Sequence, residues 1–203
     1  FLLYYNEKKL EEAGFSAPPK TWAEVESMGP KLTDPAKNTY CYAAGMAAKS
    51  PYNGAYIEYY SLVYQCNETV LKNGLCNLNS PGAIKALKFY AHLHNDLKIY
   101  APGALTNMEA DKIEAFGAEQ TALLWSNVAH VTVIEKRNPK LKFGLAPLPE
   151  GDTYGTVLTG WNTTMSKSSK NKEVAWEFIR WLTGPEGNAK MTMAAKHLPG
   201  NTK

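Results

Sequence analysis

The sequence lacks most of the features on which catalytic and metal chemistry usually depend. It holds three cysteines and four histidines in 203 residues, and none of them has the spacing of a zinc site or a catalytic triad. The phosphate-binding P-loop, the GxSxG pattern of hydrolases and the dinucleotide-binding GxGxxG are absent too. We therefore expect no metal and no cofactor, and the sequence gives little support to an enzyme.

The sequence also lacks a strong excess of one charge sign and a long apolar run. The net charge is +3, and the basic residues are scattered rather than gathered in the stripe that nucleic-acid binding requires. No apolar run approaches the roughly 20 residues that cross a bilayer. The opening residues 1–5 are too short for a signal peptide and lack its basic flank. With 44% hydrophobic residues, the composition predicts a soluble globular protein with a sizeable core.

Cysteine placement leaves two alternatives open. Cys66 and Cys76 flank the turn signal Asn73-Gly74, and a chain that doubles back there brings the two sulfurs towards bonding distance. A disulfide between them would place the protein outside the cytosol. The alternative is a pair of free thiols. Cys41 lies in an apolar run and is expected to be buried and inert.

The stretch 121–146 predicts strand, turn, helix and strand. Residues 121–125 are apolar, and Ser126 and Asn127 have side chains that can cap a helix over the following residues. Ligands collect at the loop that follows the first strand of such a unit. Trp125, Ser126 and Asn127 are therefore candidate ligand-binding residues, with a core position as the alternative for Trp125.

The remaining pattern alternates between short strands and helices, which favours an α/β fold. We expect strands at 1–6, 39–46, 75–78 and 156–165, and helices at 7–13, 21–32, 52–64, 80–97, 110–116, 172–182 and 186–195.

Aromatic residues supply the second set of candidates. Tyr52, Tyr56 and Tyr60 recur every four residues on one face of a predicted helix, and Trp161 follows Gly160 in a predicted strand. Aromatic rings pack against the apolar faces of sugars, while short polar side chains bond their hydroxyls. The alternatives are a packed helix face for the tyrosines and a core position for Trp161.

Several weak signals in a fixed order resemble the extracellular solute-binding proteins of ABC importers, in the carbohydrate-binding cluster that includes maltose-binding protein. Together these signals span nearly the whole chain. They are Tyr4-Tyr5-Asn6, Pro18-Pro19 with Thr21-Trp22, Ser80-Pro81 before Phe89-Tyr90, Phe116 with Thr121-Ala122-Leu123, Phe143-Gly144 with Pro147-Leu148-Pro149, Gly160-Trp161, Ala175-Trp176 with Trp181-Leu182, and Leu198-Pro199.

The resemblance implies two α/β lobes, of the type II periplasmic-binding-protein kind, that close on a ligand between them. Residues 1–6 would be a hinge strand, residues 7–147 the C-terminal-type ligand-binding lobe, and residues 148–203 a crossing segment with part of the other lobe. The chain begins and ends without a closing element, so we expect a fragment that lacks much of the first lobe and the C-terminus.

The family's stacking tryptophan falls here on Ala129, which leaves Trp125 and Trp161 as candidate replacements. The family's other binding aromatic maps to the region of Tyr52 to Tyr60, and Gly160-Trp161 matches a pair found at the cleft.

The function that this resemblance implies is non-catalytic binding of a sugar or oligosaccharide and its delivery to a membrane permease. A periplasmic or extracellular location follows, with a lipid anchor through the missing N-terminus as an option. Export, together with the turn signal at Asn73-Gly74, predicts that Cys66 and Cys76 form a disulfide. The alternatives are a carbohydrate-active enzyme and a binding protein for a phosphorylated polyol.

Overall fold

The computed structural model describes residues 1–47, 54–160 and 162–197. The chain forms two compact units: Phe1–Asn127 with Ile134–Val157 (the first unit), and Val128–Val133 with Leu158–Lys203 (the second unit). The elements in chain order are β1 (Leu2–Asn6), α1 (Glu7–Glu12), α2 (Trp22–Met28), η1 (Gly29–Leu32), η2 (Pro35–Lys37), β2 (Tyr40–Ala43), α3 (Gly54–Gln65), β3 (Leu71–Lys72), β4 (Leu75–Cys76), α4 (Pro81–Asn95), α5 (Glu109–Gly117), β5 (Thr121–Ser126), α6 (His130–Arg137), β6 (Phe143–Ala146), α7 (Lys172–Thr183) and α8 (Pro185–Ala195).

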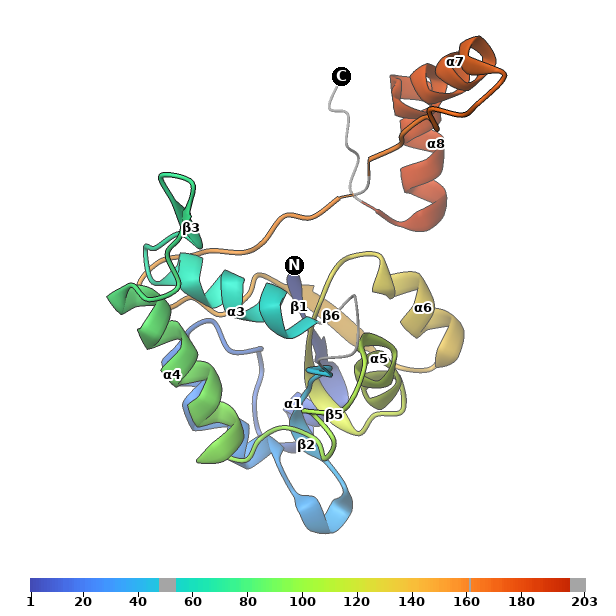
Figure 1. The fold of residues 1–203 in the computed structure, drawn as a ribbon. Coiled ribbons are helices and arrows are strands. Elements are labelled where there is room, and N and C mark those ends of the chain that lie inside the picture. Colours follow the sequence, from blue (N-terminus) through green and yellow to red (C-terminus); the bar gives the residue numbers. More distant parts are fainter. Residues whose placement is uncertain (48–53, 161, 198–203) are drawn as a thin grey trace. The chain divides into compact units, whose positions relative to one another are not determined.

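A four-stranded mixed sheet in the order β2-β5-β1-β6 forms the centre of the first unit (Figure 1). β1 pairs antiparallel with both β5 and β6, and β2 pairs parallel with β5. The predicted strand, helix and strand of 121–146 are confirmed. However, β5 and β6 are not neighbours, because β1 lies between them. The predicted α/β class, a mixed sheet flanked by helices, is confirmed as well.

Both faces of the sheet are covered, because successive side chains of a strand point to opposite faces. Leu3 and Trp125, which are register partners, join the core formed with α2, α3 and α4. Tyr4 points the other way, and its ring packs against Phe116 of α5 and Phe143 of β6. Every residue of β5 is buried, as expected for a strand with layers on both sides.

Local sequence signals set the helix starts. The Ser80 hydroxyl accepts a hydrogen bond from the Ala83 backbone N–H at 3.3 Å, and Thr21 caps α2 in the same way. The helix predicted over 21–32 ends at Met28 and continues as the tighter η1, because proline at position 30 cannot donate to the preceding turn.

The strand predicted over 156–165 is wrong, since neither 156–160 nor 162–165 contains regular structure. Its first residues bond instead to the first unit. The Phe1 backbone N donates to the Val157 carbonyl at 3.0 Å, and the Val157 N–H donates to the Ser61 hydroxyl at 3.3 Å. These bonds use the backbone groups of Val157 that a sheet neighbour would need.

The segment that precedes Val157 is held in place by the buried Gln65 at the end of α3. Its amide oxygen accepts from the Trp22 indole at 2.7 Å, and its amide nitrogen donates to the Gly155 carbonyl at 2.8 Å. Its backbone carbonyl also accepts from the N–H groups of Asp152 and Thr153. Residues 150–157 are therefore held on the first unit by side-chain and backbone bonds together.

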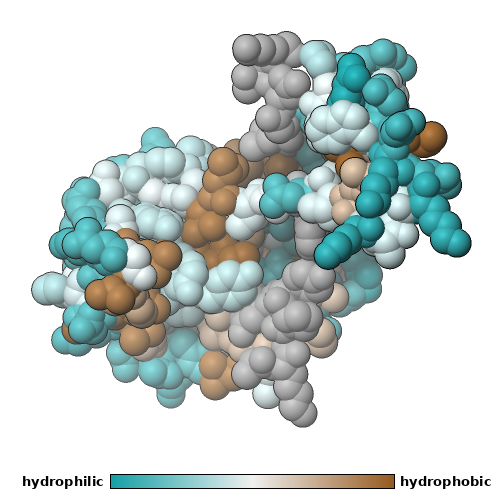
Figure 2. Space-filling model, turned by 45° about the horizontal axis from the view of Figure 1, so that its top comes forward, coloured by the Kyte–Doolittle hydropathy of each residue, from teal (hydrophilic) through white to brown (hydrophobic). Residues whose placement is uncertain are grey.

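The described part of the second unit consists mainly of α7 and α8, which pack against each other. Trp176 and Trp181, both on α7, are 54% and 46% exposed. Figure 2 shows exposed hydrophobic side chains in separate clusters among hydrophilic ones on the face drawn. Across the described ranges, no helix combines the length and apolarity needed to cross a membrane.

The predicted bond between Cys66 and Cys76 is absent, because both are free thiols. The chain does double back at Asn73-Gly74, but the two-residue turn places Leu71 opposite Cys76. Cys66 lies five positions earlier and is buried, whereas Cys76 is exposed on the hairpin. Burial raises the pKa of the Cys66 thiol, and burial raises that of Cys41 further, which makes both poor nucleophiles.

We expect three reactive thiols when the unreduced protein is denatured and titrated with a thiol reagent. All three cysteines are unpaired in the structure. A count of one would show that Cys66 and Cys76 are bonded in solution and would contradict the structure.

Replacing Gly45 by alanine should lower the free energy of unfolding by about 1–3 kcal/mol, the usual cost of overpacking. A Cβ there would lie 2.6 Å from the backbone carbonyl oxygen of Met108, which cannot move aside as a side chain does. Gly160→Ala is the matched control, because nothing lies within 4 Å of its Cβ position. Urea unfolding of both variants measures the difference, and equal stability would contradict the close approach.

Candidate functional site

The carboxyl ends of β2 and β5 meet at one edge of the sheet, because the two strands are parallel. β1 runs the opposite way, so Leu2 pairs with Ser126 at that same edge. Ligands of open α/β sheets bind beyond the carboxyl ends of the strands. We take this edge of the first unit as the candidate site.

The structure brings Trp125, Ser126 and Asn127 to this edge, but their exposure differs. Trp125 is 5% exposed, with its ring edge-on to Tyr42, and Ser126 is fully buried. Asn127 is half-buried, and its carbonyl accepts from the Tyr4 hydroxyl at 2.7 Å. In this conformation Asn127 alone of the three reaches the surface appreciably.

The predicted capping role is wrong for Ser126. Ser126 is the last residue of β5, and α6 begins only at His130. The strand continues through Ser126 because its backbone pairs with Leu2 of β1.

The tyrosine face of α3 is confirmed as a helix face. The Tyr56 and Tyr60 rings lie 5.7 Å apart in an edge-to-face arrangement, and Tyr56 is 44% exposed. Tyr52 and Trp161 lie outside the described residues. Gly160 is exposed, and it belongs to the second unit.

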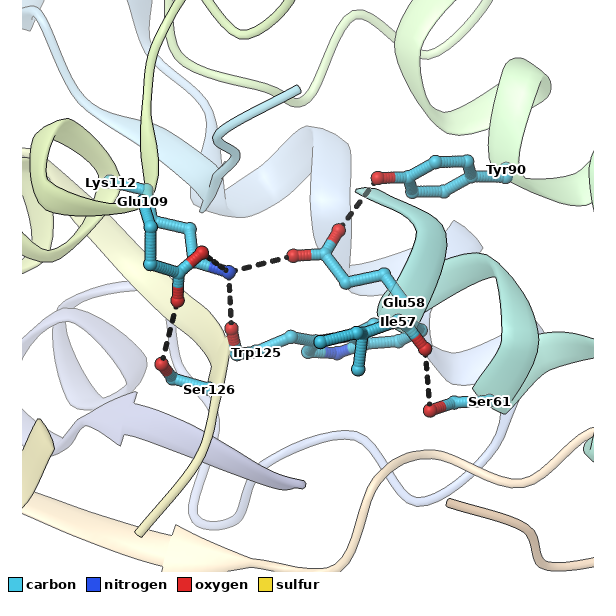
Figure 3. A network of polar contacts seen from close by, with 8 residues as sticks. All are labelled: Ile57, Glu58, Ser61, Tyr90, Glu109, Lys112, Trp125 and Ser126. Carbon is cyan, nitrogen blue, oxygen red and sulfur yellow. Dashed lines mark hydrogen bonds and ion pairs between the residues drawn. The ribbon is translucent and has the colours of Figure 1, made fainter. Parts of the chain in front are cut away.

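A buried charge network below this edge was missed by the sequence reasoning (Figure 3). The ammonium group of Lys112, on α5, has no exposed surface. It lies 3.0 Å from a Glu58 carboxylate oxygen, 2.9 Å from a Glu109 carboxylate oxygen and 2.9 Å from the Trp125 carbonyl. Two of these contacts, to Glu58 and to the Trp125 carbonyl, are hydrogen bonds, and the contact with Glu109 is an ion pair.

Glu58, on α3, is the inner carboxylate of the network. Its second oxygen accepts from the Tyr90 hydroxyl at 2.7 Å. Burial raises the pKa of Glu58 even though Lys112 and the Tyr90 bond lower it. Burial alone would lower the pKa of Lys112, but attraction to Glu58 and Glu109 outweighs it and raises that pKa.

Glu109 is the outer carboxylate, with 20% of its side chain exposed. Its other oxygen lies 3.4 Å from the Ser126 hydroxyl. The network therefore joins α3, α4 and α5 to the last two residues of β5. The only sequence signals were a Glu109–Lys112 pair with helical i, i+3 spacing and a glutamate, Glu58, among the tyrosines of α3.

In the described ranges no three His, Cys, Asp or Glu side chains are grouped to hold a metal ion. An open hollow of about 490 Å³ lies elsewhere in the first unit, between the end of α4 and the loop at 100–106, and none of the predicted site residues lines it.

Comparison with known proteins gives a consistent result. A family model described as bacterial extracellular solute-binding protein matches residues 1–189. A binding protein of Brucella abortus is 29% identical over 201 residues, which are 98% of this chain and 48% of that protein. The chain thus spans about half the length of the curated relatives it matches.

Solved structures agree. An ABC transporter solute-binding protein of Thermotoga lettingae, bound to alpha-D-tagatose, has a TM-score of 0.86 and 28% identity over 98% of this chain and 51% of its own. The maltose-bound MalE3 of T. maritima has a TM-score of 0.83 and 25% identity over 99% and 52% of the two chains. The fold is that of type II periplasmic binding proteins, as predicted.

We expect Lys112→Met to lower the free energy of unfolding by about 3–5 kcal/mol, because it leaves carboxylates without their buried counter-charge. Adding Glu58→Gln should recover part of this loss. Lys88→Met, at an exposed lysine of α4, is the control and should change stability by less than about 0.5 kcal/mol.

The loss of unfolding free energy in Lys112→Met should also depend on pH. The pKa of Glu58 is already raised in the folded protein, and loss of Lys112 raises it further. A raised folded-state pKa means that protonation favours the folded state, so the deficit of Lys112→Met should shrink between pH 7 and pH 5. Urea unfolding at both pH values measures it, and a deficit independent of pH would contradict the assignment.

Proposed function

The chain belongs to the bacterial extracellular solute-binding protein family, and on that premise we propose that it is part of a sugar- or oligosaccharide-binding protein that serves an ABC importer. The observation that carries this proposal is its similarity, over nearly its full length, to tagatose- and maltose-bound proteins. Residues 7–147 would form the C-terminal-type ligand-binding lobe, with residues 1–6 as a hinge strand. Residues 148–203 would form the crossing segment and part of the other lobe.

The protein would bind its ligand without changing it and pass it to the permease subunits in the membrane. A periplasmic or extracellular location follows from the family, and a lipid anchor would keep the protein close to the permease.

The ligand contacts that we propose combine flat and polar surfaces. Tyr56 and Tyr60, with Tyr52 before them, would offer aromatic faces, and Asn127 would bond hydroxyls. Trp125 and Ser126 lie beneath this surface and would reach the ligand only with a small rearrangement. Gly160 and Trp161 would supply a stacking surface from the segment that follows residue 157.

A thermal-shift screen of the full-length protein against neutral sugars, polyols and their phosphorylated forms tests the function. We expect stabilisation by at least one neutral member, and recovery of that compound chemically unchanged after long incubation. Conversion of the compound would favour the enzyme alternative, and no response to any member would reject the proposed function.

Trp161→Ala should weaken binding of the best compound by about 1–3 kcal/mol, by analogy with truncated aromatic hot spots. This is roughly a 5- to 150-fold loss of affinity. Trp176→Ala is the matched control, since Trp176 is 54% exposed on α7. Calorimetric titration of both variants is the measurement, and unchanged affinity for a folded Trp161→Ala would place the stacking site elsewhere.

A further inference from the structure

We propose that Glu109 is a ligand-binding residue that accepts hydroxyl hydrogen bonds and makes the site select uncharged solutes over anionic ones. This inference rests on the proposed function and specifies the class of solute. It concerns a residue that the sequence reasoning did not single out, and three observations carry it.

The first observation is position. Glu109 is the first residue of α5, and one of its carboxylate oxygens lies 3.4 Å from the hydroxyl of Ser126. Ser126 is the last residue of β5, so the carboxylate lies at the carboxyl edge of the sheet, where ligands of such folds bind.

The second observation is the uneven burial of the two carboxylates. Glu58 has 4% of its side chain exposed, and both of its oxygens are engaged, by Lys112 and Tyr90. Glu109 has 20% exposed. Of the three charged groups in the network, Glu109 is therefore the one that solvent or a solute reaches.

The third observation is the ion pairing within the network, which fixes the orientation of the Glu109 carboxylate. Two carboxylates, Glu58 and Glu109, share the one ammonium group of Lys112 in the network drawn in Figure 3. Lys112 holds one Glu109 oxygen at 2.9 Å and is itself fixed by Glu58 and the Trp125 carbonyl. The carboxylate is thus oriented before any ligand arrives, which reduces the entropy lost on binding.

A carboxylate in this place discriminates by charge. Hydroxyl groups donate charge-assisted hydrogen bonds to it, which are stronger than bonds between neutral groups. A phosphate group brought to the same edge would meet a like charge in a region of low dielectric and would be repelled. The inference therefore favours a neutral sugar or polyol over a phosphorylated polyol.

The test uses the full-length protein and pairs of probes that differ by one phosphate group: glucose with glucose 6-phosphate, glucitol with glucitol 6-phosphate, and glycerol with glycerol 3-phosphate, together with maltose and tagatose. Wild-type protein should bind a neutral probe more tightly than any phosphorylated one. Glu109→Gln should weaken binding of that neutral probe by about ten- to a hundredfold, the loss expected for a hydrogen bond to a charged group. The Glu109→Gln variant should also show a smaller ratio between its affinities for the neutral probe and for the phosphorylated form of the same probe.

Asp111→Asn is the matched control, because it removes the same charge from the same first turn of α5. Asp111 is exposed, and its carboxylate accepts from the Met108 backbone N–H at 2.8 Å. The affinity of the Asp111→Asn variant for the neutral probe should stay within twofold of the wild-type affinity. Urea unfolding midpoints of both variants show whether each is folded, and Glu109→Asp provides a second test that keeps the charge and should retain the preference for uncharged probes.

The outcomes separate the two proposals. Neutral binding that Glu109→Gln leaves unchanged, or equal losses in both variants, would overturn the role of Glu109 and leave the proposed function standing. Tighter binding of a phosphorylated probe by wild type would overturn the selection for uncharged solutes. If no probe binds, the sugar-binding function itself fails and the inference fails with it.

Discussion

The buried ammonium group of Lys112 is the constraint on which the first unit depends most. It is a full charge with no exposed surface, and it is tolerated because three acceptors from three different elements surround it. Removal of a single partner would leave an uncompensated charge in a region of low dielectric. The positions of α3, α5 and the end of β5 are therefore coupled to one another, in addition to being packed together.

This coupling lies directly beneath the sheet edge proposed as the ligand site. Apolar packing around β5 fixes the sheet as a whole, but it is not directional. The charge network adds direction, since hydrogen bonds and ion pairs hold Glu109 and the Trp125 carbonyl in defined orientations. A site that recognises hydroxyl groups by their positions benefits from such a rigid supporting network.

Much of the fold could be predicted from the sequence because its signals are local. The caps at Thr21 and Ser80, the apolar run of β5 and the Asn73-Gly74 turn each depend on a few adjacent residues. What could not be predicted depends on distant partners. The chain before residue 158 bonds to Phe1 and Ser61 instead of joining a sheet, and the hairpin register separates Cys66 from Cys76.

In the candidate site, too, the features set by adjacent residues could be predicted and those set by distant partners could not. Periodicity placed the tyrosines on one face of α3, and the strand-and-turn pattern placed Trp125 to Asn127 at the sheet edge. The burial of Trp125 and Ser126, by contrast, follows from helices that pack on both faces of the sheet. Glu58 and Lys112 are 54 positions apart, and no local pattern indicates that they meet.

The bonds of Gln65 have a mechanical consequence. Because one buried amide and its backbone carbonyl hold residues 152–155, and Ser61 holds Val157, this part of the chain moves with the body of the first unit. The first unit therefore ends at Val157, directly after these bonds, and the second unit continues from Leu158. The bonds of Gln65 thus determine how far along the chain the first unit extends.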